Sequence, residues 1–150
     1  MTTIKYGFTG TRDGLNTAQR KSITNLLQKH IDLDDIIEVH HGDCIGADKD
    51  FHDICTSLNK QGIFDIKQNT PDVKQIKIII HPPNIDTLRA FCKSDNITKP
   101  RDYLERNKDI INSTNVLIAC PLNDMEIARS GTWMTVRYAR RQNKKILLFV

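Results

Sequence analysis

The segment IIEVHHGDCIGADKDFHDICTSL, residues 36–58, decides the fold that the sequence predicts. It begins with a short apolar run from Ile36 to His40, which has the length and composition of a buried strand. Gly42 and Gly46 then mark a turn. Beyond the turn, apolar side chains recur at helical spacing, at Phe51, Ile54, Cys55 and Leu58. The segment is therefore a strand, a turn and a helix in succession, which is the repeating unit of α/β proteins.

The same unit recurs on both sides of this segment. Short, mostly apolar runs predict five strands, at Ile4–Thr9, Ile36–His40, Ile76–Ile80, Val116–Cys120 and Ile146–Val150. Helical patterns lie between most of them, and the first is capped by Asn16 with Gln19 three residues later. The whole pattern predicts an α/β fold, with an open, mostly parallel sheet of about five strands and helices on both faces.

Some boundaries between these elements are less regular. We expect Gln61 and Gly62 to end the second helix. A turn is predicted at residues 69–71, and a short helix with a loop over residues 84–98. Gly131 leads into the last helix.

The composition is that of a globular protein. We expect a chain of 150 residues, 39% hydrophobic and 27% charged, to form one domain spanning residues 1–150. No run approaches the ~20 apolar residues that cross a bilayer, and no signal peptide is visible, so we expect a cytoplasmic protein without a membrane partner. The four cysteines are widely spaced, which predicts free thiols. The net charge of +4 mildly favours anionic partners, but by itself it does not indicate nucleic acid.

Three turns are predicted to meet where a ligand binds in such a sheet, outside the carboxyl ends of the strands. A helix that starts at such a turn offers free N–H groups and partial positive charge to an anion, and glycine permits close approach. Hydroxyl groups and the Arg12 guanidinium add donors. The predicted ligand contacts are Thr9, Gly10, Thr11, Arg12, Gly42, Asp43, Gly46, Ala47, Asp48, Ser130, Gly131 and Thr132. Neither G-x-x-x-x-G-K-[ST] nor G-x-G-x-x-G occurs, which disfavours P-loop and ordinary dinucleotide-dehydrogenase functions.

Four motifs give the chain a resemblance to the SLOG superfamily. They are GFTGTRDG (7–14), HGDCIGADKDFHD (41–53), YLERNKDIINSTNVLIACP (103–121) and SGTWMTVRYARRQNKKILLF (130–149). That superfamily includes the Lonely Guy phosphoribohydrolases and the DNA-processing proteins of natural transformation. The resemblance implies a Rossmann-like fold, binding of a nucleotide or nucleotide-derived ligand, and a homodimer or higher homo-oligomer.

The resemblance also implies roles for particular residues. Thr9, Gly10 and Arg12 match the first-loop position, and Gly42, Gly46, Ala47 and Asp48 match the second. Arg106 and Asn107 match an R-N or R-K pair, whose arginine belongs to the active site of the Lonely Guy branch. Gly131 and Thr132 match the G-T of that branch's P-G-G-x-G-T-x-E-E motif.

The chain departs from that motif where the branch carries its catalytic carboxylate. Met134 and Thr135 occupy the E-E positions. Cleavage of an N-glycosidic bond passes through oxocarbenium-like charge, which a carboxylate stabilises. Substitutes would come from Asp43, Asp48, Asp124 or Glu126, the last two within a segment, residues 121–130, that has the length of a lid. The catalytic candidates, if the protein is an enzyme, are Arg106, Glu126, Asp124 and Asp48.

Several residues admit a plainer interpretation. His40 and His41 are consecutive on a strand and point to opposite faces, so we expect no metal site there, and no cofactor. Asp48 either caps its helix or contacts the ligand. Arg106 either contacts the ligand or pairs with a surface carboxylate. Trp133 either stacks on a base or, as we favour, is buried against the sheet.

Three functions are consistent with these features. The first is binding of a nucleotide or nucleotide-derived small molecule at the carboxyl edge of the sheet, as a sensor or sequestering module. The second is hydrolysis of the N-glycosidic bond of a nucleotide. The third, which we disfavour, is binding of single-stranded nucleic acid through the basic run Arg140, Arg141, Lys144 and Lys145, whose plainer interpretation is a solvated helix end.

Overall fold

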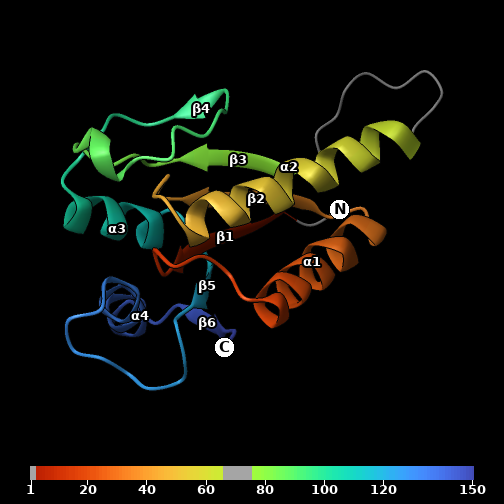
Figure 1. Cartoon of the computed structure of the whole chain (residues 1–150). Helices are drawn as coiled ribbons and strands as arrows, with labels where there is room; N and C mark the ends of the chain where they lie inside the picture. The colour runs from red at the N-terminus through yellow and green to blue at the C-terminus, as the bar shows by residue number, and fades with distance from the viewer. Residues whose placement is uncertain (1–2, 66–75) are drawn as a thin grey trace.

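The computed structural model describes residues 3–65 and 76–150, which form one six-stranded sheet flanked by helices (Figure 1). The strands are β1 Thr3–Gly10, β2 Ile36–His41, β3 Ile76–Ile80, β4 Asn96–Ile97, β5 Val116–Cys120 and β6 Lys145–Leu148. The helices are α1 Thr17–Asp32, α2 Ala47–Asp65, α3 Tyr103–Asn112 and α4 Gly131–Arg141, with a short 3-10 helix, η1, at Asp86–Leu88. The strand order is β4-β3-β2-β1-β5-β6, and every pairing is parallel.

The structure confirms the predicted α/β class and the five predicted strands. It adds a sixth, β4, whose two residues pair with Ile79 and Ile80. The helix end predicted at Gln61 and Gly62 is wrong, because α2 continues to Asp65. One glycine inside a helix costs only about 1 kcal/mol relative to alanine, which a long packed helix tolerates. The turn predicted at residues 69–71 lies outside the described residues.

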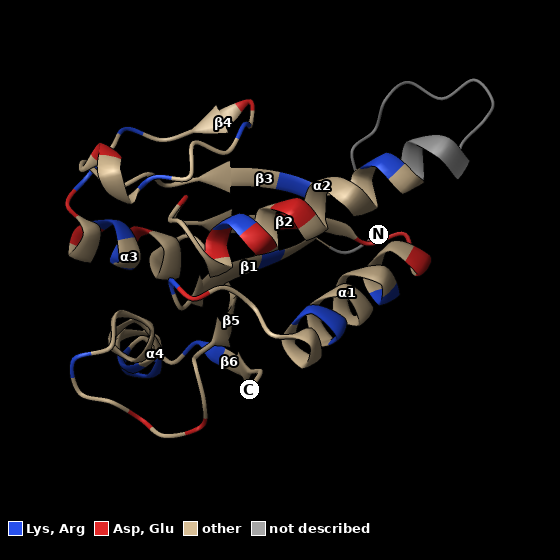
Figure 2. Cartoon of the chain, in the orientation of Figure 1, with Lys and Arg blue, Asp and Glu red and all other residues tan. Residues whose placement is uncertain are grey.

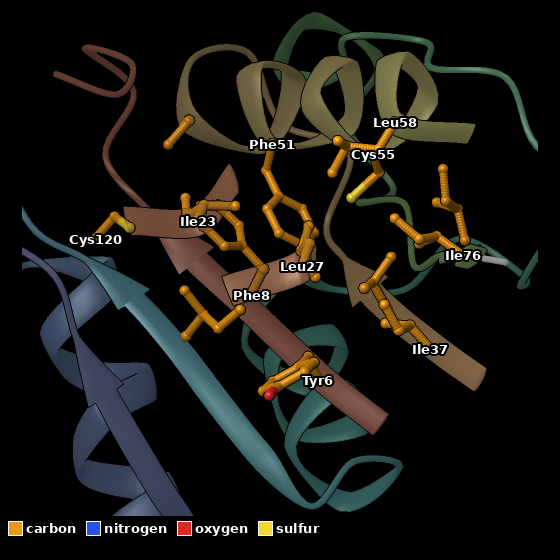
Figure 3. Packing of buried hydrophobic residues seen from close by; sticks show 14 of the residues in the cluster. Tyr6, Phe8, Ile23, Leu27, Ile37, Phe51, Cys55, Leu58, Ile76 and Cys120 are labelled. Atoms are coloured by element: carbon orange, nitrogen blue, oxygen red, sulfur yellow. The ribbon is translucent and has the colours of Figure 1, made fainter. Parts of the chain in front are cut away.

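Helices cover both faces of the sheet, as predicted. Alternate residues of β5 belong to two separate apolar clusters, which places these clusters on opposite faces. On one face, side chains of α1 and α2 pack on β1 and β2, with Phe51 stacked on Phe8 at 4.2 Å between ring centroids (Figure 3). On the other face, Trp133 and Val136 of α4 pack with Leu117. Trp133 is buried, as favoured from the sequence.

The predicted cap of the first helix is present. The backbone N–H of Gln19 donates to the side chain of Asn16 at 2.8 Å, and the backbone N–H of Asn16 donates to the side chain of Gln19 at 3.0 Å. The buried Gln19 amide also donates to the carbonyls of Pro121 and Phe149, at 2.8 and 2.9 Å. The start of α1 is thereby tied to the ends of β5 and β6.

The outer edge of β3 is only partly paired by the short β4. The side-chain amide of Asn59 takes the place of a neighbouring strand at Ile76. It donates to the Ile76 carbonyl at 3.0 Å and accepts from the Ile76 N–H at 3.1 Å. Ser94 donates to the carbonyl of Ile78 at 2.6 Å. Side chains therefore satisfy main-chain groups that β4 does not reach.

The cysteines agree with the free thiols expected from their spacing. All four cysteines are free, and Cys55 and Cys120 lie in the core. Within residues 3–65 and 76–150, no helix is both long and apolar enough to cross a membrane.

Candidate functional site

A cavity of about 350 Å³ lies at the carboxyl ends of β1 and β2, the edge where parallel α/β sheets bind ligands. Three strand-to-helix turns and helix α3 form most of its wall. Of the residues predicted to contact a ligand, these line the cavity: Thr9, Gly10, Thr11, Arg12, Gly42, Asp48, Arg106, Asn107, Ser130, Gly131 and Thr132. Turns that are far apart in the sequence therefore meet at one place, as expected.

Three residues predicted as ligand contacts do not line the cavity: Asp43, Gly46 and Ala47. Gly46 has φ of +102°, and a β-carbon there would lie 2.4 Å from the carbonyl oxygen of Arg12. A β-carbon at Gly10 would lie 2.5 Å from the β-carbon of Ala47. Gly10, Gly46 and Ala47 therefore pack the first two turns against each other, and this packing accounts for the two glycines even if no ligand contacts them.

Packing also explains why residue 42 is a glycine. Nη1 of Arg106 donates to the carbonyl of Gly42, and to that of His81 at 3.3 Å. A β-carbon at residue 42 would lie 2.1 Å from this Nη1 atom. The second turn therefore carries glycine at the position that the Arg106 side chain crosses.

Arg106 is buried, so the surface ion pair considered from the sequence is wrong. Both of its terminal nitrogens also contact Sγ of Cys44, at 3.6 and 3.5 Å. Its Nε is buried and has no hydrogen-bond partner among the described residues. A buried donor without an acceptor is costly, which makes a ligand or a water the natural partner for this nitrogen.

Asp48 is the acidic group of the cavity wall. Its Oδ2 accepts from the backbone N–H of Cys44 at 3.1 Å, so its partner is the turn before the helix. Burial raises the pKa of Asp48 to about 6, against the opposing effects of the Arg106 cation and of hydrogen bonds from Cys44 and Gly42. Burial and the Asp48 charge also raise the pKa of the Cys44 thiol. Near neutral pH, Asp48 is thus a carboxylate that takes up a proton easily.

Asp43 holds the second turn to the segment that follows β3. It has φ of +56° and is completely buried. Its carboxylate accepts from Nε of Arg89 at 2.9 Å and from the backbone N–H of Cys92 at 2.8 Å. Its carbonyl accepts from Ala90 N–H at 2.8 Å. Asp43 is therefore a structural residue, and it is not available as the substitute catalytic carboxylate.

Four of the five histidines form two separate hydrogen-bonded groups, consistent with opposite faces of β2. His40 contacts His81 at 2.7 Å and Glu38 at 2.8 Å. His41 accepts at Nδ1 from the N–H of Asp43 at 3.0 Å, which assigns the ring proton to Nε2, and Nε2 lies 2.9 Å from Nδ1 of His52. Burial lowers the pKa of both His41 and His52, so both rings are neutral near pH 7.

Ligand atoms of His41, His52 and Cys92 lie within 4.8 Å of one another, close enough to share a metal ion. The hydrogen bonds of His41 do not favour a bound metal ion. An ion bound at Nε2 of His41 would displace its proton, while Nδ1 must stay unprotonated to accept from Asp43. We therefore interpret this group as a buried hydrogen-bonded cluster.

The catalytic candidates separate into two places. Arg106 and Asp48 line the cavity, whereas Asp124 and Glu126 are exposed on the loop between β5 and α4 and do not line it. Figure 2 shows acidic positions in red along this loop. Glu126 pairs with Arg140 at 2.8 Å and with Arg137 at 3.4 Å. These contacts fix the loop to α4 and occupy part of the basic run.

The start of α4 forms the third side of the cavity. The side chain of Ser130 caps the helix by accepting from the N–H of Trp133 at 3.4 Å. Gly131 and Thr132 complete the first turn, and Thr132 is buried. A capped helix start at a cavity is suited to hold an anion.

Sequence reasoning missed several residues of the wall, among them Cys44, Ile45, Leu88, Tyr103 and Arg129. Ile45 lies within a predicted turn and Arg129 directly precedes another, so proximity in sequence could have indicated both residues. No sequence pattern indicated Leu88, because it reaches the cavity through a segment that folds back over the second turn. The N–H of Ile45 donates to the carbonyl of Leu88 at 3.2 Å.

The fold and the site define the chain as a Rossmann-like α/β protein with a cavity at the carboxyl edge of its sheet. It is similar in fold to the X-ray structure of TM1055, a target of the Northeast Structural Genomics Consortium, with a TM-score of 0.52 and 12% sequence identity. The similarity covers 97% of this chain and 72% of that one, and at this identity it shows the fold alone. No protein-family model and no curated protein matches the chain.

Proposed function

We propose that the cavity binds a nucleotide or a small molecule derived from one. The observation that carries this proposal is the convergence of three strand-to-helix turns on one cavity that is also lined by Arg12, Arg106 and Arg129. Guanidinium groups and helix starts together favour a phosphate. The volume, about 350 Å³, lies within the ~300–1,000 Å³ of typical small-molecule sites.

In this proposal the phosphate lies at the start of α4, near Ser130, Thr132 and Arg129. Asp48 would repel a phosphate, so it faces the neutral part of the ligand, such as a ribose hydroxyl. The buried Nε of Arg106 would donate to a ligand oxygen or to a bound water. The resemblance to SLOG proteins supports the same ligand class, whereas the similar solved structure supports only the fold.

Calorimetry against AMP, GMP, CMP, UMP, NAD and ADP-ribose tests this proposal. We expect at least one compound to bind, and Arg129→Ala to weaken its binding at least tenfold, because a charge-assisted hydrogen bond is lost. Arg141→Ala is the matched control, since Arg141 is exposed at the end of α4 and does not line the cavity. Folded protein that binds none of the six compounds would contradict the proposal.

The position of Asp48 on the cavity wall supports a second candidate function, hydrolysis of the N-glycosidic bond of a nucleotide. A carboxylate beside the anomeric carbon can stabilise positive charge or take a proton from the attacking water. Asp48 lies on the cavity wall, and its pKa of about 6 is close to the value that suits a general base near neutral pH.

Chromatography for free base after incubation with each nucleotide tests the hydrolase. We expect Asp48→Asn to release free base at least a hundredfold more slowly than the wild type while it still binds the nucleotide. Glu126→Gln is the control, because Glu126 does not line the cavity. Equal release by wild type and Asp48→Asn would rule out this role for Asp48, and no release from any nucleotide would rule out the activity.

A further inference from the structure

Cys44 differs from the other three cysteines in its surroundings. It is partly exposed and lines the cavity, whereas Cys55, Cys92 and Cys120 are buried and do not line it. Burial raises the pKa of Cys92 and Cys120 to about 12, and it raises the pKa of Cys55 as well. A thiol reacts in its ionised form and only where a reagent can reach it. A reagent that enters the cavity therefore meets a single thiol that can react.

The Arg106 guanidinium lies against this thiol. Its Nη1 and Nη2 atoms donate to Sγ of Cys44, at 3.6 and 3.5 Å. Nε of the same group has no hydrogen-bond partner within residues 3–65 and 76–150, although Arg106 is only 4% exposed. A buried N–H without an acceptor favours a bound group that carries one. A group attached to Sγ that carries carboxylate or amide oxygens can supply this acceptor.

The cavity around Cys44 carries an excess of positive charge. Arg12, Arg106 and Arg129 line it, and Asp48 is the single acidic residue among the described residues that do so. A cleft lined mainly by one sign of charge raises the local concentration of reagents that carry the opposite sign. Anionic reagents should therefore reach Cys44 faster than cationic ones.

We propose that Cys44 is a modification site, at which small disulfides with net negative charge, such as glutathione disulfide, form a mixed disulfide inside the cavity. The Cys44 thiolate attacks one sulfur of the reagent, so that a new S–S bond forms to Sγ and the original S–S bond breaks. The second sulfur leaves with the electron pair as a thiolate and takes up a proton, which balances the proton that Cys44 has lost. Cys44 is thereby oxidised, and half of the reagent is reduced.

The adduct occupies the space that a ligand would use. The exchange itself does not depend on the proposed nucleotide binding; only its effect on a nucleotide rests on that function. If the cavity binds a nucleotide, the mixed disulfide competes with it, and a thiol reductant restores the site.

Asp48 controls the rate of this exchange. Burial and the Asp48 charge raise the pKa of the Cys44 thiol, and Arg106 acts against them. The exchange is therefore slow at neutral pH and faster in mildly alkaline solution, where more of the thiol is ionised. Asp48→Asn removes the negative charge and lowers the pKa, so we expect this variant to react faster than the wild type at the same pH.

Mass spectrometry of the folded, reduced protein after incubation with glutathione disulfide or cystamine tests the proposal. Each rate is divided by the rate of N-acetylcysteine amide, an uncharged model thiol, with the same reagent. We expect one adduct, on Cys44, and a normalised rate about tenfold higher for the anionic glutathione disulfide than for the cationic cystamine. Cys44→Ser should form no adduct.

Two arginine variants test whether the charge of the cavity selects the reagent. Arg129→Ala should slow the reaction with glutathione disulfide and should not slow the reaction with cystamine. Arg141→Ala is the matched control, because Arg141 is exposed and does not line the cavity. This variant should react with both reagents at the rates of the wild type.

The results separate this inference from the proposed function. Wild-type protein that stays unmodified while the model thiol reacts completely overturns the inference, and so do equal normalised rates for the two reagents. Calorimetry with the six compounds used above then compares modified with reduced protein, and we expect modification to weaken binding at least tenfold. Equal binding would overturn the competition, while nucleotide binding stands. If reduced protein binds none of the six but Cys44 is modified selectively, only the proposed function falls.

Discussion

Arg106 crosses the second turn at Gly42, donating to its carbonyl at a point where a β-carbon would lie 2.1 Å from the guanidinium. The turn and the arginine therefore depend on each other: glycine makes room for the side chain, and the side chain satisfies the carbonyl. This relationship explains a glycine at the cavity without any bound ligand.

Gly42→Ala should consequently destabilise the protein. The added methyl group would force the buried Arg106 away from its acceptors, and overpacking of this kind costs about 1–3 kcal/mol. Urea unfolding measures the change. Gly131→Ala is the control, because its β-carbon would lie 3.4 Å from Tyr103 Oη, which is an ordinary contact at the start of α4. Equal stability of the wild type and Gly42→Ala would show that Arg106 moves freely.

Arg106→Met should raise the pKa of Asp48 above its value of about 6. The Arg106 cation opposes the effect of burial, so its removal leaves the charged form of Asp48 less favourable. Carbon NMR of the side-chain carboxyl across a pH series measures the pKa. Arg101→Met provides the control, since Arg101 is exposed and pairs with Asp109. An unchanged or lowered pKa in Arg106→Met would contradict this electrostatic coupling.

Acidification should destabilise the fold through its buried histidines. Burial, with the nearby charges of His40 and Arg106, lowers the pKa of His81 from 6.5 to about 4. Between these two values the unfolded chain binds the proton and the folded chain does not, so stability falls as the pH drops from about 6.5 toward 4. This one side chain accounts for up to about 3 kcal/mol.

The pH effect is measured by the urea midpoint at several pH values, and His81→Asn should flatten its slope. Asp48 acts in the opposite direction, because its pKa is raised and the folded chain binds its proton first below about pH 6. Asp48→Asn should therefore steepen the loss of stability in acid. In Asp48→Asn, where the opposing effect is removed, a midpoint that does not change between pH 7 and 5 would contradict the prediction for His81.

Asp43→Ala should be among the most destabilising single changes in the chain. It leaves the Arg89 guanidinium and the N–H of Cys92 without their buried acceptor, and loss of one partner of a buried ion pair costs about 3–5 kcal/mol. Asp43→Asn should cost less, because asparagine retains an acceptor and tolerates a positive φ. The two variants are compared by urea unfolding. Equal losses for both would show that the carboxylate charge, and not the hydrogen bonding, holds this segment.

The sequence was sufficient to place five of the six strands, because buried parallel strands such as Val116–Cys120 are unbroken apolar runs. The meeting of the three turns also followed from topology alone, since parallel strands bring their carboxyl ends to one edge. Two-residue β4 could not be predicted, because a pair of residues carries no periodicity.

Other features depend on pairings between residues far apart in the chain. Asp43 is 46 residues from its partner Arg89, and nothing local distinguishes it from Asp48, which lines the cavity. The same holds for Leu88, which reaches the cavity only because Asp43 and Ile45 bind its segment. A glycine in a turn can make room either for a ligand or for another side chain. Which of the two applies depends on what the tertiary fold places beside it.

The Asn59 amide on Ile76 has a consequence for how molecules of this protein meet one another. An exposed strand edge is a template on which a second chain can add a strand and begin an ordered aggregate. Asn59 occupies both main-chain groups of Ile76, and Ser94 occupies the carbonyl of Ile78, which such a strand would need. Two small polar side chains therefore protect this margin of the sheet from strand addition at high protein concentration.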